Sequence, residues 1–529
     1  MDEAFDIVVV GGGHNALVAA AYLASASLSV AVLERCAALG GDAATEELTL
    51  PGFRHDVAAS AHTVFQQNPI VRDDDLGLLS YGLRYQRPDP VFVLPFADGE
   101  SIVMHRDPDR TAQEIGRYDA RDGAAYIELL AQWRLLAPLQ GEERSRPPMT
   151  PEEFARHWRG GPLGDEGLRL RMASAVEVIR ERFSHPRVLA FLYWASTLTF
   201  EAIDEAGTGL LPFSLTAGRQ QYSWTTPEGG SGALPDALAR LITERGGRIE
   251  TRADVTSILV AGGRATGVET RDGRRFLARH AVVTGQHVTQ LPESLPDGAI
   301  DDETLGYIRR WKAGLTMFVA HYALQRAPRY RVRGGEQAAV AMGALASEEA
   351  LERNLAAFRL GQVTTHEPFL LAINSSLVDP SRAPQGQHTL KLISIQPYGL
   401  AGGPARWDHE KEGVARAMLD AYLPLTTNLS RGDILAQALE SPLDLERRNG
   451  NNFRGSGHGG SSQFGQYGYY RPAPRWNAYR TPVAALYLTG STTHPGGSVS
   501  GFPGRNAAQA VLADLGIALE DVTACWRRS

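Results

Sequence analysis

The sequence predicts an α/β fold in which a Rossmann-like domain receives an inserted α+β domain. Three observations support this prediction. Residues 6–41 contain a short apolar run, a glycine-rich turn, an alanine-rich stretch and a second apolar run, which is the order of a βαβ unit. Two more glycine-rich segments, residues 227–285 and 485–504, again combine short apolar runs with the start of a helix. A chain of 529 residues is long enough for roughly two or three domains.

The N-terminal βαβ unit predicts a site for the ADP part of a dinucleotide. Residues 7–10 are apolar and form the expected buried strand. Gly11 and Gly13 then allow a tight turn that brings backbone N–H groups against a pyrophosphate. Ala16 replaces the third glycine of the motif, where a small residue lets the helix pack on the strand. The helix expected over residues 15–26 would direct its positive N-terminus at the phosphates.

The second strand of the unit ends on an acidic residue. Residues 28–33 form the expected strand, and Glu34 follows at about the 20-residue separation that places a carboxylate on the ribose hydroxyls. An acidic side chain here favours a free ribose over a 2′-phosphate. Strand, turn, helix, strand and terminal glutamate come in order, and this context distinguishes a nucleotide site from an ordinary glycine-rich turn.

Composition excludes several other classes of function. The net charge of −7 gives no basis for nucleic-acid binding. No apolar run approaches about 18 residues and the first strand follows Met1 closely, so we expect neither a transmembrane segment nor a signal peptide. We therefore expect a cytoplasmic protein, with peripheral membrane contact left open. Cys36 and Cys525 form no closely spaced pair and have no metal-ligating neighbours, so neither a redox disulphide nor a metal site is expected.

The central segment is expected to complete the Rossmann-like domain. A helix leads into a strand over residues 248–251, and glycine turns separate strands over residues 255–260, 266–270 and 275–278 into a β-meander. A further short strand over residues 281–285 would return the chain to the main sheet. In the C-terminal segment a strand again runs into a glycine-rich loop and a helix, but no second complete dinucleotide motif follows a strand.

Two long insertions separate these segments. Residues 106–224 are expected to be largely helical, with Thr111 and Glu114 in the spacing of a capping box. The residues expected on the buried face of one of these helices are Ile127, Leu130 and Trp133. Residues 300–445 mix helices with extended runs, such as residues 317–324 and 369–373. We assign residues 1–105, 225–299 and 446–529 to the Rossmann-like domain, and residues 106–224 and 300–445 to the inserted substrate domain.

A glycine- and tyrosine-rich stretch, residues 456–470, precedes the final strand. Disorder is the simplest interpretation of such a composition. We predict instead an ordered loop near the cofactor, whose aromatic side chains wall an apolar pocket.

Three motifs together carry a family resemblance. They are GGGHNALVAAAYLA with LERCAALGG at the N-terminus, EGGSGALPDALA in the centre, and YRTPVAALYLTGSTTHPGGSVSGFPGRNAA near the C-terminus. The sequence resembles the phytoene-desaturase-related FAD-dependent oxidoreductases, and most of all the branch of pyridine nucleotide-disulphide oxidoreductase domain-containing proteins. The resemblance covers most of the chain. It implies a p-hydroxybenzoate-hydroxylase-like FAD-binding domain, a mixed-sheet substrate domain and non-covalent FAD.

The resemblance also implies which residues contact FAD. The predicted contacts are Gly11, Gly13, His14, Asn15, Ala16, Glu34, Arg35, Gly40, Gly41, Asp42, Val255, Gly490, Ser491, Ser498, Val499, Gly501 and Phe502. The N-terminal glycines and Asn15 would hold the pyrophosphate, Glu34 and Arg35 the ribose, and the backbone of Val255 the adenine. The C-terminal residues would meet the ribityl chain and flavin ring. One departure stands out: Asp42 occupies a position that is often Arg or Lys in the desaturases and amine oxidases, which distances the chain from both groups.

The implied reaction removes two electrons from a small organic molecule. A C–H bond would give a hydride to the flavin while a base or solvent takes a proton, leaving a C=C or C=N bond. The chain lacks the cysteine pair and second nucleotide domain of a disulphide reductase. The electron acceptor is expected to be oxygen, a quinone or another carrier. His494, in the C-terminal glycine loop, is the catalytic candidate. A redox-neutral flavin isomerase, an amine oxidase and a non-catalytic escort-type binding protein remain alternatives.

Overall fold

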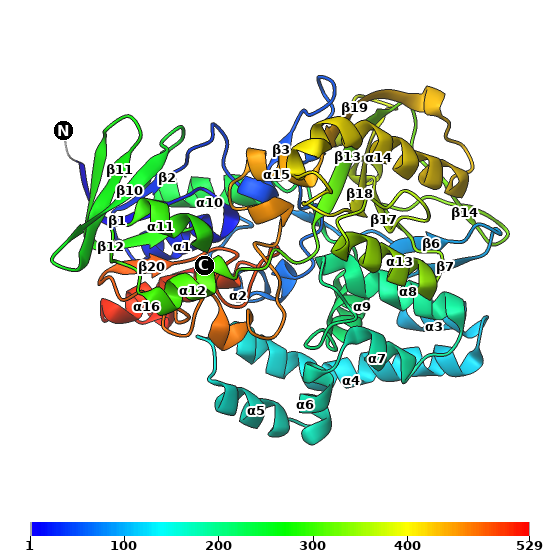
Figure 1. The fold of residues 1–529 in the computed structure, drawn as a ribbon, viewed down its shortest axis with the longest axis horizontal. Coiled ribbons are helices and arrows are strands. Elements are labelled where there is room, and N and C mark those ends of the chain that lie inside the picture. The colour runs from blue at the N-terminus through cyan, green and yellow to red at the C-terminus, as the bar shows by residue number, and fades with distance from the viewer. Residues whose placement is uncertain (1–2, 528–529) are drawn as a thin grey trace.

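The structure, a computed structural model, describes residues 3–527 and is built on two seven-stranded sheets. Figure 1 shows the first sheet on the left, the second at the upper right, and a group of helices below the second sheet. The strands of the first sheet are β1 (Glu3–Val10), β2 (Val30–Leu33), β9 (Arg248–Glu250), β10 (Val255–Ala261), β11 (Arg264–Thr270), β12 (Arg275–Thr284) and β20 (Leu486–Leu488). Strand β1 lies in the middle, parallel to both β2 and β12.

The two faces of the first sheet are covered differently. Ile7 and Val9 pack with helices α1 (His14–Ser25), α10 (Ala233–Glu244) and α16 (Phe502–Asp514). The alternate residues of β1 face the meander β10–β12 instead, because successive strand side chains point to opposite faces. Helix α16 crosses α1 at Gly504, where an added Cβ would lie 2.2 Å from the Asn15 carbonyl oxygen. Glycine at this position therefore brings the C-terminal segment against the N-terminal unit.

Strand β12 corrects one sequence expectation. We predicted two strands, over residues 275–278 and 281–285, but the structure has one continuous strand. It pairs with β1 on both sides of an irregularity at Arg279 and His280; its first part also pairs with β11, and its last part pairs with β20. The charged residues Arg279 and His280 interrupt the apolar pattern because they lie at an exposed part of the strand and not because the strand ends there.

The second sheet has the order β19–β13–β18–β17–β16–β6–β7. Its strands are β6 (Phe92–Pro95), β7 (Ser101–Met104), β13 (Met317–Leu324), β16 (Ala341–Ala344), β17 (Leu370–Ile373), β18 (His388–Ile395) and β19 (Ile434–Glu440). Strands β6 and β7 fall within residues 1–105, which we assigned to the Rossmann-like domain, so that boundary is corrected. They form a hairpin that joins the second sheet where Val93 pairs with Met342, a long-range contact that the local pattern does not indicate.

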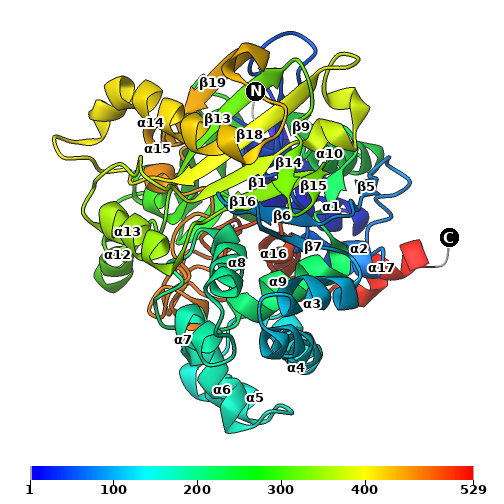
Figure 2. The same cartoon turned by 90° about the vertical axis from the view of Figure 1, so that its right-hand side faces the viewer.

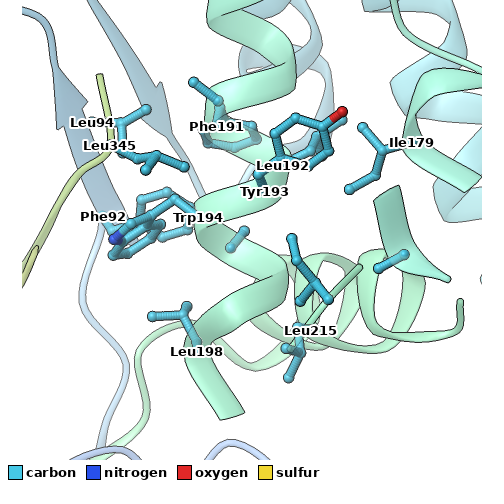
Figure 3. Packing of buried hydrophobic residues seen from close by; sticks show 14 of the residues in the cluster. Phe92, Leu94, Ile179, Phe191, Leu192, Tyr193, Trp194, Leu198, Leu215 and Leu345 are labelled. Atoms are coloured by element: carbon cyan, nitrogen blue, oxygen red, sulfur yellow. The ribbon is translucent and has the colours of Figure 1, made fainter. Parts of the chain in front are cut away.

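Helices cover both faces of the second sheet. Helix α14 (Trp407–Tyr422) packs on one face, while α8 (Pro186–Ser196) packs on the other (Figure 2). Trp194 of α8 lies 4.7 Å from Phe92, centroid to centroid, and its indole N–H donates to the Leu370 carbonyl oxygen at 2.8 Å (Figure 3). An aromatic pair of this kind adds about 0.5–1.5 kcal/mol beyond the burial of its area. It ties the helical insertion to the second sheet.

The helical insertion follows the predicted content but not the predicted local details. Its other helices are α3 (Pro108–Gly116), α4 (Ala120–Arg144), α5 (Pro151–Arg159), α6 (Asp165–Met172), α7 (Ala175–Arg180) and α9 (Leu211–Tyr222). Asp107, not Thr111, caps α3, because its carboxylate accepts the N–H groups of Asp109 and Arg110. On α4, Leu130 and Trp133 are buried as expected, but Ile127 is exposed.

Shorter elements connect these layers. The remaining helices are α2 (Pro69–Arg72), α11 (Leu291–Ser294), α12 (Asp302–Arg309), α13 (Glu348–Arg359), α15 (Pro442–Arg448) and α17 (Leu519–Arg527). The remaining strands are β3 (Thr45–Glu46), β4 (His55–Asp56), β5 (Tyr85–Gln86), β8 (Thr226–Pro227), β14 (Tyr330–Val332) and β15 (Gly335–Gln337). Across residues 3–527, we find no helix with the length and apolar character that crossing a bilayer requires.

Candidate functional site

A cavity of about 1260 Å³ extends between the two sheets. One end is lined by the end of β1, the start of α1, the end of β2 and the start of β10. We call the other end the distal end. Its lining residues are Ala58, Ala59, Ser60, Ala61, Thr63, Val64, Gln67, Leu198, Thr199, Phe200, Ser214, Leu215, Arg219, Trp224, Met317, Leu371, Ile373, Ile393, Gly457 and His458. The cavity therefore joins the predicted dinucleotide motif to the second sheet without interruption.

The glycine turn leaves its backbone open toward this cavity. Gly11 has φ +96°, and its N–H donates to the Leu33 carbonyl oxygen at 2.8 Å. A Cβ added to Gly11 or to Gly13 would meet no protein atom within 4 Å, and both residues line the cavity. No side chain caps the N-terminus of α1, so its first N–H groups remain available to an anion. These features fit a pyrophosphate.

Glu34 stands at the end of β2 with its carboxylate held in place. Its Oε2 accepts the N–H of Gly12 at 2.6 Å, and its Oε1 accepts the N–H of Cys36 at 2.7 Å. Each oxygen keeps a lone pair for a further donor, such as a ribose hydroxyl. Arg35 and Val255 line the same part of the cavity. The carboxylate is thus oriented before any ligand binds.

The second glycine pair is tied to the first. Gly40 and Gly41 both have positive φ, and the Gly40 N–H donates to the Gly12 carbonyl oxygen at 2.8 Å. Ala16 lies at the same end of the cavity and is buried, and a Cβ added to Gly285 would approach its Cβ to 3.4 Å. Only small side chains fit between these segments.

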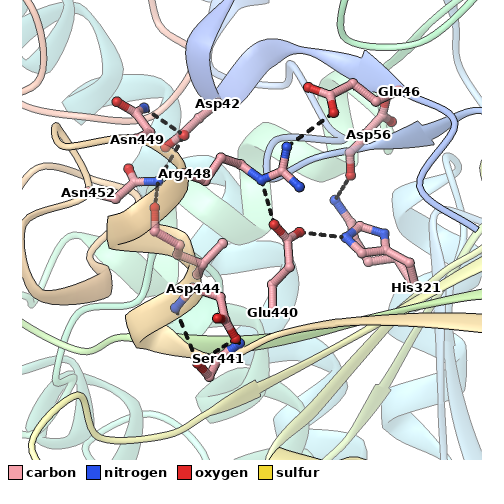
Figure 4. A network of polar contacts seen from close by, with 12 residues as sticks. Asp42, Glu46, Asp56, His321, Glu440, Ser441, Asp444, Arg448, Asn449 and Asn452 are labelled. Carbon is pink, nitrogen blue, oxygen red and sulfur yellow. Dashed lines mark hydrogen bonds and ion pairs between the residues drawn. The ribbon is translucent and has the colours of Figure 1, made fainter. Parts of the chain in front are cut away.

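Asp42 takes part in a contact that the sequence did not reveal. Its Oδ1 accepts the side-chain N–H groups of Asn449 and Asn452, each at 3.0 Å (Figure 4). Burial raises the pKa of the Asp42 carboxyl. Both asparagines also line the cavity. The two asparagines belong to an amide-rich run that precedes the final family-like motif. This place in the sequence is the only feature that could have indicated a role for them.

A buried polar network supports the cavity wall near Asp42. Arg448 donates to Glu440 at 2.5 Å and to Glu46 at 3.1 Å, which links β19 to β3 (Figure 4). On strand β18, which β13 separates from β19, Lys391 donates to the carbonyl oxygens of Asp56 and Ala58 at 3.1 and 2.6 Å. Burial lowers the pKa of Lys391 to about 8. These contacts hold the segment around Ala58, which lines the cavity, against the second sheet.

The C-terminal loop reaches the cavity with only part of the predicted set. Gly490, Ser491, Ser498 and Val499 line it. His14 Nε2 lies 3.2 Å from the Ser498 carbonyl oxygen, which connects the N-terminal turn to this loop.

Gly501 and Phe502 do not line the cavity. Gly501 precedes α16 with φ +71°, and a Cβ there would lie 2.7 Å from the Phe65 ring. Phe502, the first residue of α16, is buried. Their predicted contact with the flavin therefore has no support from their positions.

His494 is also away from the cavity. Its ring is buried, with Nε2 2.8 Å from the Glu143 carbonyl oxygen of helix α4. Burial lowers the pKa of His494 to about 4, so the ring is neutral near pH 7. Because His494 does not line the cavity, its position does not favour the predicted catalytic role.

The glycine- and tyrosine-rich loop contributes backbone and one imidazole to the distal end. Gly457 and His458 line the cavity, whereas Phe464 is exposed and Tyr467 donates to the Glu143 carboxylate. The expected aromatic wall is therefore not formed by the tyrosines. Burial lowers the pKa of His458 to about 4, so this ring too is neutral near pH 7. Its ring stacks on Phe200 at 6.2 Å, centroid to centroid.

Ionisable groups are sparse at the distal end. Of the residues assigned to it, Arg219 and His458 are ionisable, and the Asp42 carboxylate lies beside Gly457, where an added Cβ would be 3.5 Å from Asp42 Oδ2. The other assigned residues are apolar, glycine, hydroxyl-bearing or amide-bearing, apart from Trp224. Cys36, the free cysteine of the described residues, lies beside Glu34 at the opposite end, and the side chain of Cys525 lies outside the described residues. No group of three or more His, Cys, Asp or Glu side chains gathers in the described part of the chain as a metal site would require.

Comparison with known proteins agrees with this geometry. The chain is 28% identical to pyridine nucleotide-disulfide oxidoreductase domain-containing protein 2 of Mus musculus, over 97% of this chain and 94% of that protein. It is 23% identical to a lycopene-forming phytoene desaturase of Pseudescherichia vulneris, over 96% of this chain and 98% of that protein. The fold resembles that of cyclohexylamine oxidase from Brevibacterium oxydans, with a TM-score of 0.58, 16% identity, and 97% and 99% of the two chains covered.

These findings confirm the predicted resemblance and the predicted α/β fold with a Rossmann-like FAD-binding domain. A model of the family described as flavin containing amine oxidoreductase matches residues 17–301, more than half of the chain. The matched range includes Asp42, so an acidic residue at this position does not set the chain apart from that family. The chain belongs to the flavin containing amine oxidoreductase family.

Proposed function

We propose that the chain is an FAD-dependent oxidoreductase that removes a hydride and a proton from a small organic molecule, leaving a C=C or C=N bond. The observation that carries this proposal is the continuous cavity, which joins the glycine turn and Glu34 to the apolar face of the second sheet. A dinucleotide held at Glu34 and directed along this cavity would extend toward the distal end. The relative named for phytoene desaturation supports the same class of reaction.

Backbone N–H groups and one carboxylate would hold FAD. The open turn at Gly11 and Gly13 and the start of α1 would bind the pyrophosphate, and Glu34 would accept the ribose hydroxyls. Non-covalent binding is proposed because the free thiol of Cys36 lies at the ribose end and not at the distal end. When bound, FAD supplies the two-electron acceptor for the substrate hydride.

The distal end would position the substrate and exclude water. Leu371, Ile373 and Ile393 present the apolar side of β17 and β18 to the cavity. Such a surface packs against a carbon skeleton and favours desolvation of the reacting bond. The neutral imidazole of His458 can accept a proton, and bulk water is the other acceptor. Oxygen, a quinone or another carrier would then reoxidise the cofactor.

Reduction by nicotinamide nucleotides separates this proposal from a reductase. Under anaerobic conditions, we expect NADH and NADPH to bleach the flavin absorbance of the oxidised protein slowly or not at all, because a single dinucleotide motif is present and FAD would occupy it. A panel of organic metabolites is expected to contain at least one compound that bleaches it rapidly. The measurement is stopped-flow absorbance in the visible flavin bands. Rapid bleaching by either nucleotide, at a rate sufficient for turnover, would contradict the proposed reaction.

A further inference from the structure

Arg219 is a buried cation at the distal end of the cavity. It lies on α9 near the helix C-terminus, its side chain is 7% exposed, and it lines the cavity together with Thr63 and Trp224. The surrounding wall is formed largely by apolar side chains such as Leu198 and Leu215. The Arg219 side chain therefore places a positive charge in a largely apolar part of the cavity wall.

The contacts of Arg219 leave part of its guanidinium unused. Nη1 donates to the Thr63 hydroxyl at 3.2 Å, and the guanidinium lies 4.1 Å from the centroid of the Trp224 ring. Nε is buried without a hydrogen-bond partner, and Nη2 makes no hydrogen bond to a described residue. The indole N–H of Trp224 is also buried and unpartnered. Two adjacent side chains thus hold donors that the protein itself does not satisfy.

The other deeply buried arginines of the described chain have stronger protein partners than Arg219, although Nε of Arg171 and Nη1 of Arg382 are also buried without a hydrogen-bond partner. Arg171 and Arg382 each form an ion pair with a buried carboxylate, with N–O distances of 3.4 and 2.8 Å. Arg471 donates to three different carbonyl oxygens. Arg219 has neither arrangement, and no carboxylate of the described residues forms an ion pair with it.

An isolated buried cation is costly, so the protein needs a reason to keep one. A buried donor without a partner destabilises the folded protein, and an unpaired buried charge destabilises it more. Burial lowers the pKa of Arg219 to about 9, which leaves the side chain protonated near pH 7. Stacking on Trp224 fixes the plane of the guanidinium and partly compensates for the missing anion. The remaining compensation has to come from whatever enters the cavity.

We propose that Arg219 binds a carboxylate of the substrate, and that the substrate of this chain is an organic acid with an apolar skeleton. A carboxylate offers two oxygens in the geometry of the guanidinium fork, and a single cation in an apolar wall suits one negative charge better than a phosphate dianion. The inference rests on the proposed function, because it assigns the distal end to the substrate.

Matched acids and amides test the proposal directly. The probes are acetate, benzoate and 4-phenylbutyrate, each compared with its uncharged amide, and binding to the purified holoprotein is measured by calorimetry and by perturbation of the visible flavin spectrum. We expect at least one acid to bind about tenfold or more tightly than its amide. In Arg219→Met this preference should disappear, and in Arg219→Lys it should be reduced but present. Inorganic phosphate is expected to bind more weakly than the preferred acid.

Stability distinguishes a binding role from a structural one. Because Arg219 lacks a counter-ion, Arg219→Met is expected to melt at the same temperature as the original protein or higher. Arg182→Met is the matched control: Arg182 stacks on Phe213 at 5.4 Å but does not line the cavity, so the preference for acids should survive its loss.

Several outcomes would overturn the proposal. They are equal affinity for acids and amides, no binding of any acid, a preference that persists in Arg219→Met, or tighter binding of phosphate. Calorimetry reports the preference for acids whether or not flavin is present. A protein without flavin would therefore contradict the proposed function while leaving the test of Arg219 readable.

Discussion

Replacing Glu34 by alanine is expected to lower the affinity of the chain for FAD at least tenfold. The Glu34 carboxylate faces the cavity and is oriented by the N–H groups of Gly12 and Cys36. Charge-assisted hydrogen bonds to the ribose hydroxyls are worth about 1.5–3 kcal/mol each, and about 1.4 kcal/mol corresponds to a factor of ten. Alanine also leaves the Gly12 N–H without its acceptor, which loosens the turn that would hold the pyrophosphate. The measurement is a fluorescence titration of apo-protein with FAD.

Two further variants show whether the loss of affinity comes from the Glu34 charge itself. Glu34→Gln keeps the size and one acceptor oxygen but loses the charge, so its affinity should lie between those of the original protein and Glu34→Ala. Glu293→Ala removes another carboxylate from the lining of the same cavity, and because Glu293 is exposed its loss should leave FAD binding unchanged. An unaltered affinity in Glu34→Ala, or an equal loss in Glu293→Ala, would mean that the ribose is held elsewhere.

The protein is expected to lose stability steeply as the pH falls from 6.5 to 4. Six of the described histidines have a pKa that burial lowers to about 4 or about 3: His14, His55, His62, His287, His458 and His494. Above pH 6.5 each is neutral in both the folded and the unfolded chain, so stability there does not depend on them. Below 6.5 the unfolded chain binds protons that the folded chain excludes, and each histidine lowers the free energy of unfolding by up to about 1.4 kcal/mol per pH unit.

Two buried carboxyls act in the opposite direction, because burial raises the pKa of both Asp42 and Glu201, that of Glu201 to about 7. The folded chain therefore binds these protons first and gains stability as the pH falls toward the ordinary range of a carboxyl group. Each group of this kind offsets at most about one histidine. The net expectation is still a loss of stability toward acid.

Urea unfolding at several pH values between 7.5 and 4.5 measures this dependence. In His62→Asn, the slope of the free energy of unfolding against pH should decrease by up to about 1.4 kcal/mol per unit, because His62 is fully buried between Ser231 and Tyr85. His366→Gln removes an exposed histidine and serves as the control for loss of an imidazole. Stability that stays constant from pH 6.5 to 4.5 would contradict the account of buried neutral histidines.

Local patterns explain what could be predicted from the sequence. The strand before Gly11, the glycine turn, the helix after it and the position of Glu34 all follow from residues close together in the chain. The extended run over Met317–Leu324 is also a strand with those bounds. In these places the apolar period and the turn residues determine the structure without help from distant contacts.

Long-range packing explains what could not be predicted. Strands β6 and β7 join the second sheet where β6 pairs with β16 at Val93 and Met342, a pairing that no local pattern encodes. His494 lies in a glycine loop that reaches the cavity, yet its ring turns toward helix α4. Arg219 is one arginine within a helix, and only the assembled cavity shows that it lacks an anion.

The flavin content of the purified full chain tests the central claim most directly. The account predicts visible flavin absorbance bands, about one FAD per chain, and release of that FAD into solution when the protein is denatured by acid or heat. The released cofactor is identified by mass spectrometry. A colourless protein that cannot be reconstituted with FAD would contradict the proposed cofactor site, and flavin that stays attached to the denatured chain would contradict non-covalent binding.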